Sequence, residues 1–313
     1  MDIFDLHCDT LYRAVTEDIS LDCPAAEVQL NRDADSRRLQ CYAIWIPDSC
    51  SGEEAERLFD AAFERLKAEC KICRIHLLQR GESPRGQFFR NKNTACFTVE
   101  NAAALNGKLQ NIQRFAECGV RMMTLTWNGA NCVGDGADVE DAKGLTPFGK
   151  NALREMERCG IAVDISHASQ KLFYDIAENA ERPFAASHSN SFTVTPHRRN
   201  LTDEQFRIIA ERGGIVGINF HNAFLNRVPE RASVGDIFRH IEHFLSLGGE
   251  NTLCFGSDFD GGTLPKDIRN SHIYYKIYEK MLQENYKEAL IQNIFFNNAL
   301  YFFENFDNRQ NMV

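Results

Sequence analysis

Three histidines and three carboxylates in this chain each follow an apolar, strand-like run, and together they could bind metal ions. They are His7 and Asp9 in DLHCDT, Glu100 in CFTVEN, His167 in VDISHAS, His188 in AASHSN and Asp258 in CFGSDFDG. Imidazole nitrogens and carboxylate oxygens are the usual protein ligands of Zn²⁺ and related cations. If the runs end at one edge of a sheet, these groups could hold two cations, so the sequence predicts a two-metal site.

The spacing indicates which group would hold which cation. His7 and Asp9 are two residues apart, so on a strand their side chains point the same way and could hold one cation together. Glu100 has two carboxylate oxygens and could bridge two neighbouring cations. His167 and His188, as neutral imidazoles, would complete the shell of the second cation.

Two roles remain open for Asp258. It could be a terminal metal ligand, or a general base that takes a proton from metal-bound water. Asp260 lies two residues later and competes for either role, and we favour Asp258. Arg198 and Arg199 follow the loop after His188, and an arginine near the metals could bind a substrate carboxylate through two hydrogen bonds.

The runs that would position these groups alternate with amphipathic, helix-like stretches. Strand-like runs cover residues 2–7, 40–46, 94–99, 120–126, 161–165, 183–187, 214–219 and 252–256. Helix-like stretches cover residues 53–74, 147–159, 169–179, 202–212, 234–246 and 271–284. This alternation favours an α/β fold, the (β/α)8 TIM-like barrel of metal-dependent hydrolases. An open doubly wound sheet is less favoured, because DLHCDTLYR lacks the glycine-rich loop expected after its first strand.

The barrel also explains where the candidate ligands fall, since sites in this fold lie at the carboxyl ends of strands. The ligands follow the first, third, fifth, sixth and eighth runs. The aromatic-rich stretch 289–306 is predicted to be a last helix that closes the barrel, so residues 1–313 would form a single domain.

Composition restricts the partners and the environment of the protein. The formal net charge is −9 and the pI is about 5.5, without a stripe of Lys and Arg, which argues against nucleic-acid binding. We expect no membrane partner, because no signal peptide is apparent and no apolar run reaches the roughly 18 residues of a membrane span. Eleven cysteines without a framework spacing indicate reduced thiols, so a cytoplasmic location is predicted.

Other polar residues have simpler interpretations. Asp164 could orient a ligand histidine from behind. Cys70 and Cys73 form a lone C-x-x-C inside a helical pattern and are interpreted as ordinary helix thiols. His240 and His243 lie three apart on a predicted helix and are interpreted as surface or packing residues.

Seven motifs, taken in order and spacing, resemble one known family over nearly the whole chain. They are DLHCDT, TVENA, GVRMMTLTWN, DISHAS, ASHSN followed by RRNLTDEQ, GIVGINF and GSDFDG. The chain resembles the membrane dipeptidase (renal dipeptidase) family of zinc peptidases, in a soluble bacterial-type form. The resemblance implies a (β/α)8 barrel with two Zn²⁺ that hydrolyses dipeptides, including those with a D-residue at the C-terminal position. It also implies a homodimer.

The resemblance implies a role for each site residue. His7 and Asp9 would hold one zinc ion, His167 and His188 would hold the other, and Glu100 would bridge the two. Asp258 would be the catalytic acid/base, and Arg199, directly before the Asn of RRN, would bind the substrate carboxylate.

One position departs from the family pattern. Members that resemble the animal enzyme have a substrate-contacting histidine after TLT, where this chain has Trp127. Tryptophan donates one N–H and cannot become cationic. His221, just past the seventh run, is a candidate to replace the missing histidine in contacting substrate.

The sequence therefore predicts a binuclear zinc dipeptidase that works by metal-hydroxide attack on the peptide carbonyl. One alternative is another metal-dependent hydrolase on the same barrel, such as a deaminase, lactonase or cyclic amidase. Another is a metal-binding paralogue without catalysis, which Trp127 would support.

Overall fold

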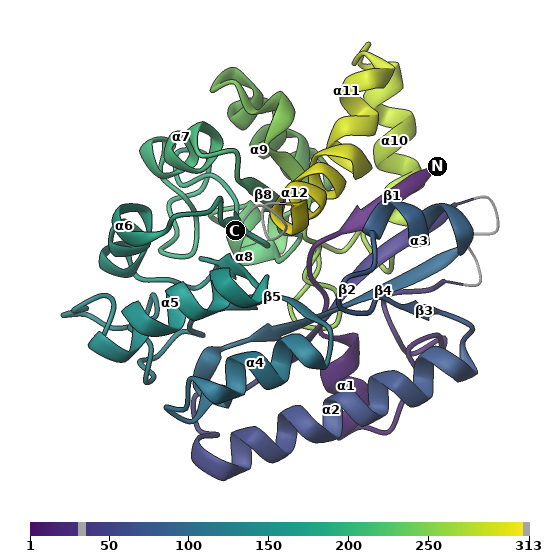
Figure 1. Cartoon of the computed structure of the whole chain (residues 1–313). Helices are drawn as coiled ribbons and strands as arrows, with labels where there is room; N and C mark the ends of the chain where they lie inside the picture. The colour runs from purple at the N-terminus through teal and green to yellow at the C-terminus, as the bar shows by residue number, and fades with distance from the viewer. Residues whose placement is uncertain (31–35, 309–313) are drawn as a thin grey trace.

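Among the residues that the computed structural model describes, 1–30 and 36–308, eight parallel strands close into a barrel (Figure 1). They are β1 (Asp2–Asp5), β2 (Arg37–Trp45), β4 (Asn93–Glu100), β5 (Val120–Thr124), β6 (Ala162–Asp164), β7 (Ala185–Ala186), β8 (Ile215–Ile218) and β9 (Leu253–Phe255). Neighbouring strands pair in this order, β9 pairs with β1, and the pairing of β2 with β4 completes the ring. The predicted (β/α)8 barrel is confirmed.

A further short strand, β3 (His76–Leu77), was not predicted. It pairs with Thr94 and Ala95 at the start of β4. The pairing of β5 with β4 begins only at Phe97, so β3 occupies the part of that edge which β5 leaves open.

Helices fill the connections between strands and surround the barrel (Figure 1). They are α1 (Thr10–Thr16), α2 (Gly52–Ile72), α3 (Pro84–Arg90), α4 (Gln110–Glu117), α5 (Pro147–Cys159), α6 (Gln170–Asn179), α7 (Asp203–Glu211), α8 (Asn222–Leu225), α9 (Val234–Ser246), α10 (Ile273–Gln283), α11 (Glu288–Gln292) and α12 (Asn298–Asn308). All six predicted helical stretches are helices. The sequence pattern missed α1, α3, α4 and α8, which are too short to show a clear helical period.

Local capping explains why the predicted helices begin where they do. The Thr146 side chain accepts a hydrogen bond from the backbone N–H of Gly149, with proline in the first turn of α5. Thr202 and Gln205 form a capping box at the start of α7. These caps determine the residue at which α5 and α7 begin.

The inside of the barrel forms a core separate from the one between strands and outer helices. Every strand of the ring contributes an apolar side chain to it: Phe4, Leu39, Cys96, Met122, Ala162, Ala185, Ile215 and Cys254. Phe303 of α12 stacks on Phe4 with ring centroids 5.3 Å apart. Arg182, shortly before β7, donates to the carbonyl oxygen of Phe306 at 2.9 Å. Helix α12 thus packs across the amino-terminal end of the barrel, which leaves the carboxyl ends of the strands open for a site.

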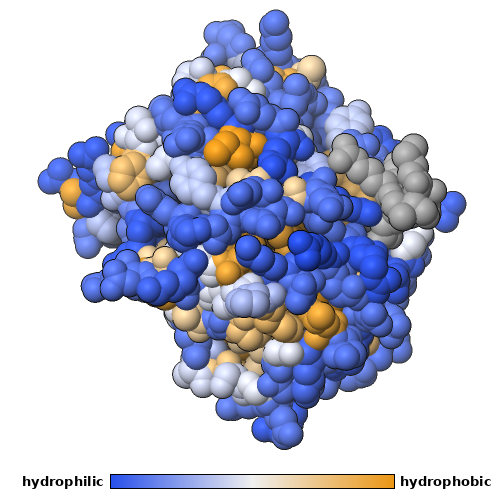
Figure 2. Space-filling model, turned by 60° about the vertical axis from the view of Figure 1, so that its left-hand side comes forward, coloured by the Kyte–Doolittle hydropathy of each residue, from blue (hydrophilic) through white to orange (hydrophobic). Residues whose placement is uncertain are grey.

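The surface is mainly hydrophilic. On the face drawn in Figure 2, apolar side chains form small separate groups among hydrophilic ones. The large apolar side chains exposed in the described parts of the chain belong to different elements: Ile72, Phe89, Tyr174, Phe192, Val228, Leu282 and Tyr301. Within residues 1–30 and 36–308, no helix has both the length and the apolar character needed to span a membrane.

Candidate metal centre and active site

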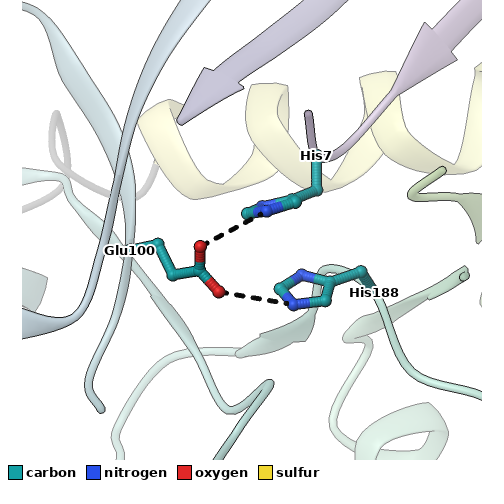
Figure 3. A group of neighbouring side chains, drawn as sticks. All are labelled: His7, Glu100 and His188. Atoms are coloured by element: carbon teal, nitrogen blue, oxygen red, sulfur yellow. Dashed lines mark ion pairs between the residues drawn. The ribbon is translucent and has the colours of Figure 1, made fainter. Parts of the chain in front are cut away.

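Glu100, the last residue of β4, faces His7 and His188, which follow β1 and β7 (Figure 3). Its Oε2 is 3.6 Å from Nε2 of His7, and its Oε1 is 3.7 Å from Nε2 of His188. Oε1 also lies 2.8 Å from Nε2 of His167. The two oxygens of one carboxylate therefore face two different groups of histidines.

Asp9 and Asp258 lie on the His7 side of this cluster. Asp9 Oδ2 is 3.3 Å and Asp258 Oδ1 is 3.9 Å from Nε2 of His7. The other oxygen of Asp258 accepts a hydrogen bond from Nδ2 of Asn219 at 2.9 Å, which leaves Oδ1 turned toward the cluster. The structure thus brings together all six residues that the sequence proposed as ligands or acid/base.

Hydrogen bonds behind the histidines determine which ring nitrogen faces Glu100. Ser187 donates its hydroxyl proton to Asp164 Oδ2 at 2.5 Å, so the hydroxyl oxygen accepts from Nδ1 of His188 at 2.7 Å. Nδ1 of His167 lies 2.8 Å from Oδ1 of Asn128, which is an acceptor. Both rings therefore carry their proton on Nδ1 and present the Nε2 lone pair to the cluster.

The cluster has the features of a cation site. The Nε2 atoms of His167 and His188 lie 3.0 Å apart, and the two lone pairs repel unless a cation lies beside them. Nε2 of His7 and Oδ1 of Asp9 are buried without a hydrogen-bond partner among the described residues. These unpaired buried atoms would be costly in the fold alone, so the donor set fits divalent cations.

Electrostatics lead to the same conclusion. Burial disfavours the charged form of His7, yet nearby carboxylates, Asp9 first among them, outweigh it and raise the pKa of His7 to about 10. Burial lowers the pKa of His167 and His188 well below the usual value. The carboxylates around His7 thus favour a positive charge at that place, whether a proton or a metal cation. His167 and His188 stay neutral, the form in which an imidazole binds a metal.

Two of the site residues have unusual backbone conformations. His167 has φ 67° and Asp258 has φ 63°, in the left-handed region that non-glycine residues rarely adopt. Each such residue costs on the order of 1–3 kcal/mol and persists only where the surroundings hold it in place. The same conformation occurs at Asp260, which fixes the loop, so the surroundings of His167 and Asp258 must hold them in place as well.

Arg199 lies beside the cluster but does not line the main cavity. Its side chain is buried, donates to the carbonyl oxygen of His188 at 3.4 Å, and lies over the Phe224 ring at 5.3 Å. Burial lowers the pKa of Arg199 to about 10. Its Nε has no hydrogen-bond partner among the described residues. Arg199 lines a small cavity that is separate from the main one. Arg198 is instead exposed and pairs with Asp138 at 3.2 Å.

A cavity of about 560 Å³ opens over the cluster. Trp127 and His221 both line it, as do Glu100, His167 and Asp258. Nδ1 of His221 accepts a hydrogen bond from the backbone N–H of Thr263 at 2.8 Å, so its proton lies on Nε2. A volume of this order suits a small molecule.

Asp260 has a different environment from Asp258. Its carboxylate accepts hydrogen bonds from Thr10 and from Arg13, both at 2.6 Å, and from the backbone N–H of Glu27. The side chain is fully buried in these contacts. Asp260 therefore fixes the loop after β9, and Asp258 is the carboxylate left to face the cluster.

Several site residues were not predicted. Asn128, Ser187 and Asn219 hold ligand or acid/base side chains in place, and Tyr12 and Trp45 line the cavity. Four of the five lie at or within two residues of a predicted ligand or a predicted strand end. The rule that sites lie at the carboxyl ends of strands could have found these four. Tyr12 lies on α1 and carries no such signal.

The histidines and cysteines outside the site have structural contacts. His240 is buried and bridges Ser191 N–H and the carbonyl oxygen of Leu225. His243 pairs with Asp203 at 2.8 Å. All eleven cysteines lie in the described part of the chain, and each is a free thiol.

A closed barrel with histidines and carboxylates gathered at the carboxyl ends of its strands is the architecture of a metal-dependent hydrolase. Residues 1–312 match the profile of a family described as membrane dipeptidase (peptidase family M19), and the chain belongs to this family of metallopeptidases. The resemblance seen in the motifs is thereby confirmed, as is a hydrolase acting on peptide bonds.

Two relatives are similar to this chain over about two thirds of its length. The chain is 33% identical over 211 residues to an uncharacterized protein in the pqqA 5′ region of Klebsiella pneumoniae, covering 64% of this chain and 78% of that one. It is 30% identical over 217 residues to an uncharacterized dipeptidase of Schizosaccharomyces pombe, covering 68% of this chain and 53% of the yeast protein.

Solved structures share the whole fold. A metallopeptidase of Rhodobacter sphaeroides, liganded with a phosphinate mimic of the dipeptide L-Ala-D-Ala, superposes with a TM-score of 0.90. It is 25% identical, with 97% of this chain and 99% of that chain covered. A second metallopeptidase, named dipeptidase AC, also has a TM-score of 0.90 at 26% identity, with 97% and 98% covered.

Proposed function

We propose that this protein is a binuclear zinc dipeptidase. The observation that supports it most is the position of Glu100, whose two oxygens face the His7 side and the His167–His188 side of the cluster. A carboxylate in that position is suited to bridge two cations. Of the alternatives, only the metal-binding paralogue without catalysis has an observation in its favour, which is Trp127 in place of the family histidine.

The ligands divide into two sets around Glu100. His7 and Asp9 would hold one Zn²⁺, and His167 and His188, with Nε2 free of a proton, would hold the other. When bound, the two ions would polarise a peptide carbonyl and make water acidic enough to lose a proton near neutral pH. Nitrogen and carboxylate donors suit zinc, although other divalent ions accept the same set.

Asp258 would hold and move the proton of the reaction. Asn219 fixes its Oδ2, so Oδ1 is the atom that can accept a proton from water and pass it to the departing amine. The strained backbone at Asp258 is consistent with a side chain placed for chemistry.

Arg199 would bind the free carboxylate of the substrate and so limit the enzyme to short peptides. Its buried charge lacks a carboxylate partner within the described residues, and its Nε is unpaired. Since the similar Rhodobacter sphaeroides enzyme was crystallised with a mimic of L-Ala-D-Ala, we propose that substrates with a C-terminal D-residue are accepted here as well.

The test combines metal analysis with a panel of L,L, L,D and D,D dipeptides, lactones and cyclic amides. We expect about two zinc ions per chain and hydrolysis confined to dipeptides. Asp258→Asn should keep both ions and lose about 100- to 10,000-fold in turnover, whereas the exposed Asp18→Asn should change little. Normal turnover in Asp258→Asn, or activity on lactones alone, would overturn the proposal.

Two properties of the whole protein are proposed with it. The free state of all eleven cysteines supports a reducing, cytoplasmic environment. The homodimer implied by family resemblance stays a prediction, which light scattering of the purified protein would check.

A further inference from the structure

The only two tryptophans of the chain, Trp45 and Trp127, both line the cavity over the cluster. Their rings meet edge to face, with centroids 4.9 Å apart. Tyr12 extends the row, at 4.9 Å from Trp45, and His167 lies 6.1 Å from Trp127 at the other end. One wall of the cavity is therefore a continuous aromatic surface that reaches the edge of the proposed metal site.

This aromatic wall, made of Tyr12, Trp45 and Trp127, lies away from Arg199. Trp45 ends β2, and Trp127 follows β5, so the two flank Glu100 at the end of β4. Arg199 belongs to the segment after β7, which is directly opposite β2 in the ring of strands. A dipeptide whose carboxylate lies on the Arg199 side of the ring, with its peptide bond beside Glu100, would extend its amino-terminal residue toward the aromatic wall.

We infer that the aromatic wall binds the side chain of the amino-terminal residue and selects dipeptides in which that side chain is large and apolar. The inference rests on the proposed dipeptidase function and adds a substrate class to it. The indole of Trp127 is neutral and offers a large apolar surface to a side chain.

Kinetics of the zinc-loaded enzyme with Leu-Ala, Lys-Ala and Gly-Ala test the selection. The wild type should prefer Leu-Ala. Trp127→Ala should lower kcat/KM for Leu-Ala by about 10- to 100-fold, mainly through KM, and should leave Gly-Ala within about threefold. Trp127→Phe keeps an aromatic face and should retain most of the preference. Equal losses for Leu-Ala and Gly-Ala, or a preference for Lys-Ala, would overturn the inference.

Fluorescence provides a second readout that needs no turnover. In Trp45→Phe, Trp127 is the single tryptophan, so emission excited at long wavelength comes from the aromatic wall alone. At saturation, binding of a phosphinate mimic of Leu-Ala should change this emission more than binding of the corresponding mimic of Gly-Ala does. If the wild type hydrolyses no dipeptide, the proposed function fails, and the fluorescence titration still decides whether the wall contacts the side chain. Unchanged emission at saturation with the leucine mimic refutes that contact.

Discussion

Gly261 is the residue whose substitution should reveal most about the metal site. A Cβ built on Gly261 would lie 1.9 Å from Asp9 Oδ2 and 2.8 Å from Asp258 Oδ1. Ordinary contacts begin near 3.4 Å, so Asp9 would have to move by about 1.5 Å in Gly261→Ala. Metal–ligand distances tolerate shifts of only about 0.2 Å. The added methyl group should therefore remove Asp9 from the ligand set.

We expect Gly261→Ala to lose the metal ion held by His7 and Asp9 and to keep the one held by His167 and His188. Metal content after dialysis should fall from about two to about one per chain, and turnover should fall by at least about 100-fold, as a 1 Å misplacement alone can cause. Gly86→Ala is the matched control, because its nearest neighbour, Ser83 Oγ, is an ordinary 3.5 Å away. If Gly261→Ala kept two metals and normal turnover, Asp9 would not be a ligand.

Three further predictions follow from the same contacts. Ser187→Ala removes the acceptor behind His188 and should weaken zinc binding by about 10- to 100-fold in chelator competition. Burial raises the pKa of Glu27 to about 7. The neutral carboxyl group therefore contributes stability below pH 4.5, and this contribution is lost as the pH rises through 7. Because glutamine stays neutral, Glu27→Gln should raise Tm more at pH 8 than at pH 5. Phe303→Ala should destabilise the protein by about 3–5 kcal/mol in urea unfolding, and one cooperative transition is expected if the barrel and α12 form one domain.

The positions of the proposed ligands could be predicted, because in a barrel the place of a residue along its own strand determines where it lies in the site. In a ring of parallel strands, all carboxyl ends lie at the same edge, so a histidine or carboxylate just after an apolar run has a known place. His7, Glu100 and His188 are far apart in sequence, yet this rule is enough to bring them together.

Orientation could not be predicted in the same way. Arg199 was predicted to bind the substrate carboxylate, and the sequence did not indicate that its guanidinium donates to the carbonyl oxygen of His188 and lies over Phe224, outside the lining of the main cavity. The tautomer of His188 depends on Ser187 and Asp164, which lie on different strands. Such contacts depend on how loops pack across the barrel, and no spacing in a single sequence records that packing.

The same pair of Asp–Ser hydrogen bonds occurs at two places behind the site. Asp5 of β1 accepts hydrogen bonds from the backbone N–H and the hydroxyl of Ser257, just as Asp164 of β6 does from Ser187. Each serine immediately precedes a site residue, Asp258 in one case and His188 in the other. A buried carboxylate at the end of one strand thus fixes the turn that follows its neighbour.

The hydrogen bonds between Asp5 and Ser257 explain how the strained residue Asp258 can be placed accurately in a loop. A left-handed backbone at Asp258 would relax if the turn could move, but Ser257 is tied to Asp5 through two bonds of 2.9 and 2.6 Å. Tyr274 donates a further hydrogen bond to Asp5 at 2.8 Å from helix α10. The core therefore supplies the rigidity that the proposed two-cation site needs, because these hydrogen bonds hold the turn and do not involve the side chains proposed as ligands.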